Sequence, residues 1–415
     1  MNQAPGRRLE QQTTLAPRLA PNEPTRRPTT RLHAPANVPQ TCGPGQGAYP
    51  PGCRLLWFAG LSEGHVSDCT EYGGGYKLNY AAALRSAPHD VLLPVLMLSR
   101  YGLTPNPELS AFGRWAQAEG AHVIEVDSLS FQKDLTSHFS HLSHRGWGAR
   151  QVDHITGPFL RLDIPRMVSE HSLFSLPCAC PEYALYTDTD VMFGNVTAEA
   201  TAQALHGLAK YNGDRFVMYG AEHEMHGPPK NTGVFFMSVS RFERAWPEIL
   251  KVGLSKSFRF PERAYDQGWL NFYFNMVKAG HNSTMLPLAW NWKVYWAERG
   301  QSLSAVRIIH FHGPKAGSKY LACLASQDRA CVSRITWQNY TGSDKRFSMD
   351  DMVRLGFANN GGRMANATLL RYLRLLPPTG AFCTNTSFGA PVGHLGGKTS
   401  ERASPEGVDH RRSYS

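Results

Sequence analysis

The stretch Tyr183-Ala-Leu-Tyr-Thr-Asp-Thr-Asp-Val-Met-Phe193 is the most informative part of this 415-residue chain. An apolar run ends at Thr187, and two acids, Asp188 and Asp190, then flank the small residue Thr189. This pattern predicts a buried strand whose C-terminal end presents two carboxylates at the rim of a sheet. Ligands bind at this rim in open α/β sheets, and adjacent carboxylates repel each other unless a cation lies between them. A divalent ion such as Mn2+ or Mg2+ suits these oxygen ligands and commonly also binds a substrate diphosphate.

The motif also has a plain structural interpretation, which is a solvated turn with two acids. An isolated Asp-x-Asp is a weak signal because it arises readily by chance in a chain of this length. Its position directly after a strand favours a functional interpretation, and motifs elsewhere in the chain strengthen it.

Four further motifs accompany the two acids. Upstream lies Gly157-Pro-Phe-Leu-Arg-Leu-Asp-Ile-Pro165. Downstream lie Asn231-Thr-Gly-Val-Phe-Phe-Met-Ser238, Tyr265-Asp-Gln-Gly-Trp-Leu-Asn271 and Ile308-Ile-His-Phe-His-Gly-Pro-Lys315. In this order and spacing the five motifs resemble those of the family-eight glycosyltransferases, which include glycogenin and the bacterial lipooligosaccharide galactosyltransferases. The resemblance spans residues 55–315 and implies the α/β fold called GT-A.

The resemblance implies a role for each matching residue. Asp188 and Asp190 correspond to the family's metal-binding acids, which hold the diphosphate of a nucleotide sugar through the ion, and Thr189 lies between them in the donor site. The family's third metal ligand is the first His of a His-x-x-Gly motif and corresponds to His310. The glycine of that motif corresponds to Gly313, whose backbone lies against the diphosphate.

Four other matching positions are implied to contact the donor. Arg161 corresponds to an arginine that reaches the donor, and Asn231 corresponds to an asparagine near the donor sugar. Asp266 and Gln267 correspond to the family's Asp-Gln pair at the reacting sugar, and they are the candidate catalytic residues.

The sequence departs from the family pattern at two places. Lys315, implied to meet the phosphate, comes one residue early, no Pro-Trp follows it, and Lys319 competes for the same contact. The glycine-rich segment Leu61–Gly75 does not match the usual nucleotide-binding start, so the base-binding residues stay unassigned.

The chemistry of glycosyl transfer agrees with these residue types. A divalent ion stabilises a departing diphosphate as a Lewis acid, and positive side chains or backbone N–H groups add to this effect. The sugar passes through an oxocarbenium-like state, which a carboxylate or amide near the anomeric carbon helps to stabilise. The resemblance implies retention of configuration along a front-side path, in which the leaving phosphate takes the acceptor proton.

Most of these residues also have a purely structural interpretation. His310 ends an apolar run and could be a satisfied core histidine, and in a strand His312 would share its face. Asp266 could belong to a helix N-terminus, and Asn231 could belong to a turn before a strand. The cluster Glu222-His-Glu-Met-His226 lacks the His-Glu-x-x-His pattern of a helical metal site and lies beside Gly-Pro-Pro, which favours an exposed loop at the acceptor rim.

Beyond residue 54 the hydrophobic pattern alternates between strand and helix. We expect strands at Leu55–Ala59, Val91–Leu98, His122–Val126, Tyr183–Thr187, Arg215–Tyr219 and Val234–Met237, and helices at Tyr76–Ala87 and Pro107–Glu119. Pro94 within the second strand suits a bulge or a strand edge. This alternation predicts an α/β protein with a mostly parallel central sheet and helices on both faces.

About half of the net charge of +10 lies near the N-terminus, where residues 1–54 contain seven arginines against Glu10 and Glu23. The segment is rich in Pro, Thr and Arg and poor in large apolar residues. We therefore expect residues 1–53 to be a disordered linker, stem or targeting segment, residues 54–388 to form the GT-A domain, and residues 389–415 to be a disordered tail. No basic stripe with interleaved aromatic residues occurs in the core, which argues against a nucleic-acid partner.

The signals for the cellular compartment conflict. Five Asn-x-Ser/Thr sequons, at Asn195, Asn282, Asn339, Asn366 and Asn385, favour glycosylation in the secretory pathway. The eight cysteines lack zinc-site spacing, and the N-terminus contains neither a signal-peptide core nor a membrane-spanning run. We favour the Golgi lumen or secretory pathway, with no membrane anchor visible in this sequence; an organelle reached by a transit peptide and the cytoplasm are the alternatives.

The predicted function is a metal-dependent glycosyltransferase that uses Mn2+ or Mg2+. It moves a hexose from a nucleotide-diphosphate sugar, UDP-glucose or UDP-galactose, to a glycan or glycoprotein acceptor with retention of configuration. One alternative is a nucleotide-sugar-binding pseudoenzyme, against which the intact Asp266-Gln267 pair argues. The other is a nucleotide-sugar phosphohydrolase or nucleotidyltransferase, but the sequence contains no second acid cluster for a two-metal site.

Overall fold

The structure is a computed structural model that describes residues 53–62, 76–100, 109–140, 156–176, 179–209, 215–221, 230–255, 265–274, 283–293 and 303–311, together with 371–372, 374–377 and 381–382. These residues belong to one compact unit that extends from Thr41 to Ser415. The predicted N-terminal segment up to residue 52 and the predicted C-terminal tail lie outside the described residues.

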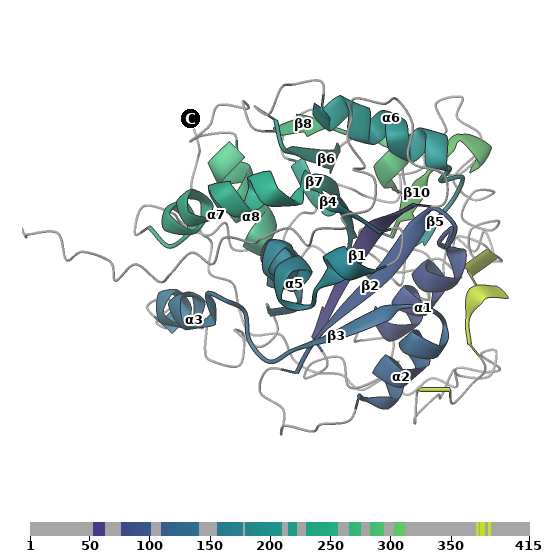
Figure 1. Cartoon of the computed structure of the whole chain (residues 1–415), viewed down its shortest axis with the longest axis horizontal. Coiled ribbons are helices and arrows are strands. Elements are labelled where there is room, and N and C mark those ends of the chain that lie inside the picture. Colours follow the sequence, from purple (N-terminus) through teal and green to yellow (C-terminus); the bar gives the residue numbers. More distant parts are fainter. Residues whose placement is uncertain are drawn as a thin grey trace, which may run out of the picture. The chain divides into compact units, whose positions relative to one another are not determined.

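The central feature of the described part is a seven-stranded sheet with the order β3–β2–β1–β4–β7–β6–β8 (Figure 1). Its strands are β1 (Arg54–Ser62), β2 (Leu92–Ser99), β3 (His122–Val126), β4 (Ala179–Thr187), β6 (Val217–Ala221), β7 (Lys230–Ser238) and β8 (Ser283–Met285). Neighbouring strands are parallel except at β7, which pairs antiparallel with both β4 and β6. Since only β7 runs against the other six strands, the predicted α/β class with a mostly parallel sheet is confirmed.

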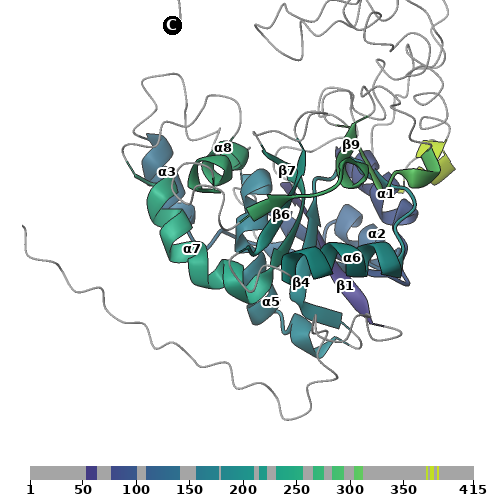
Figure 2. The same cartoon turned by 90° about the horizontal axis from the view of Figure 1, so that it is seen from above.

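Helices cover both faces of this sheet, as Figure 2 shows. One face packs against α1 (Tyr76–Ser86), α2 (Ala111–Ala118) and α6 (Ala198–Ala209), and the other packs against α3 (Gln132–Ser140), α5 (Ile164–Glu170), α7 (Val239–Gly253) and α8 (Tyr265–Phe272). Within β1 the side chains alternate between the two faces. Trp57 and Ala59 pack in the hydrophobic core under α1, α2 and α6, whereas Leu56 and Phe58 pack in the core under α3, α5, α7 and α8. Burial on both faces explains why these strands are nearly continuous apolar runs in the sequence.

The six expected strands and two expected helices are all present, with ends that differ by a few residues. β4 is longer than expected, because it begins at Ala179 rather than at Tyr183. The expectation that Pro94 marks a bulge or a strand edge was wrong, because β2 lies between β1 and β3 and Pro94 pairs with Trp57 in regular register. Pairing of β2 with β3 begins only at Val95, so Pro94 precedes the second ladder of hydrogen bonds.

A second, three-stranded sheet lies beside the carboxyl end of β4 and was absent from the sequence prediction. It has the order β5–β10–β9 and consists of β5 (Val191–Phe193), β9 (Trp292–Lys293) and β10 (Ile308–His310). β10 pairs antiparallel with β5, with His310 opposite Val191, and the backbone N–H of Phe311 donates to the carbonyl of Asp190 at 2.8 Å. This small sheet brings His310 beside the two acids, although His310 comes more than a hundred residues later in the sequence.

Candidate functional site

The two acids lie in the turn between β4 and β5, at the rim of the central sheet. The hydroxyl of Thr187, the last residue of β4, accepts a hydrogen bond of 2.8 Å from Nε1 of Trp57. The backbone N–H of Asp188 donates to the carbonyl of Gly233 on β7 at 2.7 Å. These bonds fix the turn against two neighbouring strands. The side chain of Asp188 is 30% exposed, whereas that of Asp190 is buried.

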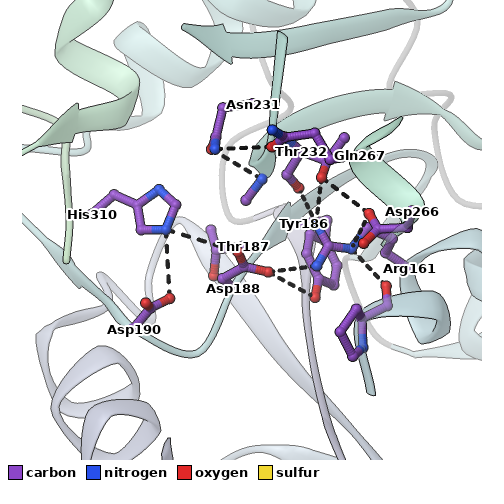
Figure 3. A network of polar contacts seen from close by, with 12 residues as sticks. Arg161, Tyr186, Thr187, Asp188, Asp190, Asn231, Thr232, Asp266, Gln267 and His310 are labelled. Atoms are coloured by element: carbon purple, nitrogen blue, oxygen red, sulfur yellow. Dashed lines mark hydrogen bonds and ion pairs between the residues drawn. The ribbon is translucent and has the colours of Figure 1, made fainter. Parts of the chain in front are cut away.

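Asp188, Asp190 and His310 form a group whose ligand atoms all lie within 4.8 Å of one another (Figure 3). Nε2 of His310 lies 3.5 Å from Oδ1 of Asp190 and 3.8 Å from Oδ2 of Asp188. Direct charge-assisted hydrogen bonds are shorter, at about 2.7–2.9 Å, whereas atoms that share one ion at about 2.0–2.2 Å stand farther apart. The spacing therefore fits a bound cation better than a direct ion pair. Two carboxylates and one imidazole favour a transition ion such as Mn2+ over Mg2+.

Arg161 connects this group to a second cluster of polar side chains. It lies in the short helical turn η3 (Leu160–Asp163) and is only 4% exposed. Its guanidinium donates to Oδ1 of Asp188 at 2.7 Å and to the carbonyl and hydroxyl of Thr232 at 2.5 and 2.9 Å, and its Nε lies 3.2 Å from Oδ2 of Asp266. The guanidinium also lies over the ring of Tyr186 at 4.5 Å. Burial opposes its charge, but Asp188 and Asp266 together raise the pKa of Arg161, so it stays charged.

Asp266 and Gln267 lie in the first turn of α8 and face β7. The carboxylate of Asp266 accepts a hydrogen bond of 3.0 Å from the hydroxyl of Thr232. Burial raises the pKa of Asp266 to about 6, although Arg161 acts in the opposite direction. The amide oxygen of Gln267 accepts from Nδ2 of Asn231 and from the backbone N–H of Thr232, both at 3.2 Å. The position of Asp266 suits a helix N-terminus, as the structural interpretation proposed, but its carboxylate is engaged with residues outside the helix.

Gly233 allows these groups to approach one another. A Cβ atom at this position would lie 2.3 Å from Cε1 of His310, 2.6 Å from Oδ2 of Asp188 and 3.0 Å from Oδ1 of Asn231. Real Cβ atoms do not approach other atoms so closely, so any other residue would displace the imidazole or the carboxylate. The Asn-Thr-Gly motif is thus part of the strand β7 itself and not a turn before it.

The structure brings together most of the residues singled out in the sequence: Arg161, Asp188, Thr189, Asp190, Asn231, Asp266, Gln267 and His310. Gly313, Lys315, Lys319, His312 and the Glu222–His226 cluster lie outside the described residues, as does the glycine-rich segment from residue 63 to 75.

Sequence reasoning missed four residues of the site: Tyr186, Thr232, Gly233 and Asn291. Thr232 and Gly233 stood inside a quoted motif, and only the asparagine of that motif was given a role. Asn291 had a weak signal of its own, since it is a single amide between Trp290 and Trp292. Tyr186 looked like one more apolar residue of its strand.

Comparisons with known proteins give likeness to solved structures only. No protein-family model and no curated protein matches the chain. The chain is similar to the apo form of glycosyltransferase GlyE from Streptococcus pneumoniae, with 13% identity and a TM-score of 0.39 over 79% of this chain and 65% of that one. It is also similar to mouse xyloside xylosyltransferase 1 (14% identity, TM-score 0.37, 62% of this chain and 97% of that one) and to galactosyltransferase LgtC with donor and acceptor sugar analogs (14%, 0.37, 71% and 98%).

These neighbours are glycosyltransferases, but the identity and TM-scores are low. The chain spans slightly less than two thirds of GlyE.

Proposed function

We propose that this protein is a metal-dependent glycosyltransferase of the GT-A type that takes a hexose from a nucleotide-diphosphate sugar. The observation that supports this most strongly is the proximity of two different clusters. The group of Asp188, Asp190 and His310 suits a divalent ion, and Arg161 joins it directly to Asp266 beside Gln267. An ion site next to a buried carboxylate and amide can stabilise both the departing diphosphate and the positive charge that develops on the sugar.

Each cluster has its own task in this proposal. Asp188, Asp190 and His310 hold the ion, which supplies Lewis-acid stabilisation to the departing diphosphate when it is bound. Asp266 accepts hydrogen bonds from hydroxyl groups of the donor hexose, Gln267 lies near its anomeric carbon, and Asn231 lies near the sugar. Arg161 orients the carboxylates of Asp188 and Asp266, because it donates a hydrogen bond to the first and forms an ion pair with the second. The resemblance adds Gly313 and either Lys315 or Lys319 as proposed contacts of the diphosphate.

The remaining parts of the proposal concern substrates and location. The donor is UDP-glucose or UDP-galactose, the acceptor is a glycan or glycoprotein, and the configuration is retained. None of the helices in the described ranges is long and apolar enough to cross a membrane. Cys180 on β4 forms a disulfide bond, and disulfide bonds persist in oxidising compartments. Together with the sequons, this bond supports the secretory pathway, with the Golgi lumen as the proposed site.

Removal of one carboxylate from the ion group tests the metal-dependent part. Asp190→Ala should abolish Mn2+-stimulated transfer and weaken Mn2+ binding at least tenfold, because it removes a ligand that contacts the ion. Asp127→Ala is the matched control, since Asp127 is an exposed acid directly after β3 and has no place in the ion group. Full activity of the wild type in EDTA would contradict the proposal.

A further inference from the structure

Asn291 is a buried amide that contacts both clusters of the site. It is the last residue of the helical turn η6 (Leu288–Asn291), directly before β9, and it is completely buried. It packs on Gly220 of β6, where a Cβ atom would lie only 2.4 Å from Nδ2 of Asn291. The backbone at Gly220 therefore leaves the room that this amide occupies.

The orientation of the Asn291 amide follows from its partners. Its Nδ2 donates to the backbone carbonyl of Ala221 at 3.0 Å, and a carbonyl can only accept. The other atom of the amide, Oδ1, must then face Nδ1 of His310, at 2.8 Å. Because an amide oxygen cannot donate, the proton of this bond belongs to Nδ1 of His310.

This bond determines which nitrogen of His310 faces the two acids. A neutral imidazole carries one N–H, so a proton on Nδ1 leaves the lone pair on Nε2. Nε2 is the atom that lies 3.5 Å from Asp190 and 3.8 Å from Asp188. The same tautomer is the one that binds metal ions through Nε2, and metal-binding histidines commonly donate their other N–H to a carbonyl or carboxylate.

The same amide also fixes the residues on the sugar side. Nδ2 of Asn291 donates to Oδ1 of Asn231 at 3.1 Å, and this oxygen also accepts from the backbone N–H of Gly233 at 3.1 Å. With its oxygen occupied, Asn231 directs its Nδ2 toward Oε1 of Gln267, at 3.2 Å. One continuous chain of hydrogen bonds thus joins His310, Asn291, Asn231 and Gln267.

We propose that Asn291 is a positioning residue that couples the ion group to the donor-sugar cluster: it holds His310 in its ion-binding tautomer and holds Asn231 in the orientation that meets Gln267. This inference rests on the proposed function. It adds that the affinity for the ion and the affinity for the sugar depend on a residue that touches neither.

Two substitutions separate the two tasks. Asn291→Leu removes the acceptor for His310 and the donor for Asn231, so the Mn2+ dissociation constant of the protein, measured without nucleotide by titration calorimetry, should rise about 10- to 100-fold. Asn291→Asp keeps an oxygen that accepts from Nδ1 of His310. It should therefore bind Mn2+ within a few-fold of the wild type, yet lose the preference for UDP-sugar over UDP that Asn231 and Gln267 provide.

A control with comparable loss of stability shows whether the effect is specific. Ile249→Ala opens a cavity in the buried face of α7, in a different core region, and should lower the melting temperature without changing the Mn2+ dissociation constant. If Asn291→Leu does not fold, the ratio of UDP-sugar to UDP affinity in Asn291→Asp carries the test, and an unchanged ratio overturns the inference.

The results distinguish this inference from the function on which it rests. Mn2+ binding by the wild type with equal binding by Asn291→Leu overturns the role of Asn291 and leaves the proposed ion site intact. An equal loss of Mn2+ affinity in Ile249→Ala and Asn291→Leu also overturns the role of Asn291, because reduced stability alone would then explain the weaker binding. Failure of the wild type to bind Mn2+ overturns the ion site and the inference together.

Discussion

At the scale of single residues, the site depends on how closely Gly233 lets its neighbours approach. Gly233→Ala should weaken Mn2+ binding about tenfold or more and reduce transfer accordingly, because the new methyl group would overlap the His310 ring and the Asp188 carboxylate. Calorimetric titration with Mn2+ measures the effect directly. Gly207→Ala on α6 is the control, since a Cβ there meets only a methionine side chain at 3.2 Å. Equal Mn2+ affinity in wild type and Gly233→Ala would show that the backbone can move aside at no cost.

The carboxylate of Asp266 should matter for the rate of transfer more than for binding of the nucleotide. Asp266→Asn keeps the shape and the acceptor for Thr232 but removes the charge. We expect kcat to fall about 100-fold with little change in UDP affinity, which is the scale of losing one preorganised electrostatic contact. A near-normal kcat with a stability loss of about 1 kcal/mol or less would instead identify Asp266 as a helix cap.

The raised pKa of Asp266 gives the same substitution a second, independent signature. Its pKa is about 6 in the folded protein and 3.8 in its ordinary state, so between these values the folded state binds more protons than the unfolded state. Stability attributable to this group therefore falls as the pH rises from about 4 to about 6. Melting temperatures of Asp266→Asn relative to wild type should increase over this pH range, and a constant difference would show that folding does not raise the pKa of Asp266.

At the scale of elements, β7, β8 and α8 meet at Lys230. The positive side chain of this residue is only 7% exposed. Its Nζ donates to the hydroxyl of Ser283 at 2.6 Å, and its backbone exchanges hydrogen bonds with Asn271 of α8. Burial lowers the pKa of Lys230 to about 8. A buried ammonium group lowers the free energy of unfolding when it is charged. We therefore expect Lys230 to stabilise this junction less than an uncharged side chain of similar size would.

Lys230→Met should therefore stabilise the protein at pH 7, by at most about 3 kcal/mol, the free energy that corresponds to the shift in pKa. Between pH 8 and 10.5 the unfolded state keeps its proton while the folded state has lost it, so the stability of the wild type rises with pH. The advantage of Lys230→Met should shrink over that interval. Thermal melts at pH 7 and pH 10 test this, and a destabilised variant at pH 7 would mean that the ammonium group has a favourable role.

The elements also show how far the sequence could predict the structure. Strands buried on both faces, such as β1 and β2, were recognisable because their apolar runs are continuous and bounded by polar residues. The antiparallel direction of β7 could not be deduced, because a buried strand has the same pattern in either direction. The sheet of β5, β9 and β10 was missed because strands of two or three residues are too short to show any periodicity.

The acids and the histidine of the site could be predicted from the sequence. The residues that act by letting other atoms come close, or by orienting another side chain, could not. Asp188, Asp190 and His310 were identified from the motifs and do lie together. Asn291 and Gly233 act through hydrogen bonds and distances that only a three-dimensional arrangement defines. For Arg161 the sequence predicted only a contact with the donor. The structure adds that its guanidinium forms ion pairs with two carboxylates of the site, Asp188 and Asp266.

At the scale of the whole molecule, we propose that residues 1–50 are a linker, stem or targeting segment that the catalytic fold does not need. A truncated protein that begins at Cys53 should keep its melting temperature and its transfer rate, since the segment is rich in Pro, Thr and Arg and poor in large apolar residues. Thermal melts and activity of the truncated and full-length proteins test this prediction. A large decrease in either quantity would show that the segment packs on the core.

The fate of the donor sugar tests the proposed transferase activity most directly. The protein is incubated with Mn2+ and radiolabelled UDP-glucose or UDP-galactose in the presence of a panel of glycan acceptors, and the products are separated and their anomeric configuration is determined. We expect UDP together with an α-linked sugar on an acceptor, and loss of this product with EDTA or in Asp190→Ala but not in Asp127→Ala. Cleavage to UMP and sugar phosphate, or donor binding with no transfer and no hydrolysis for any donor, would contradict the proposed activity.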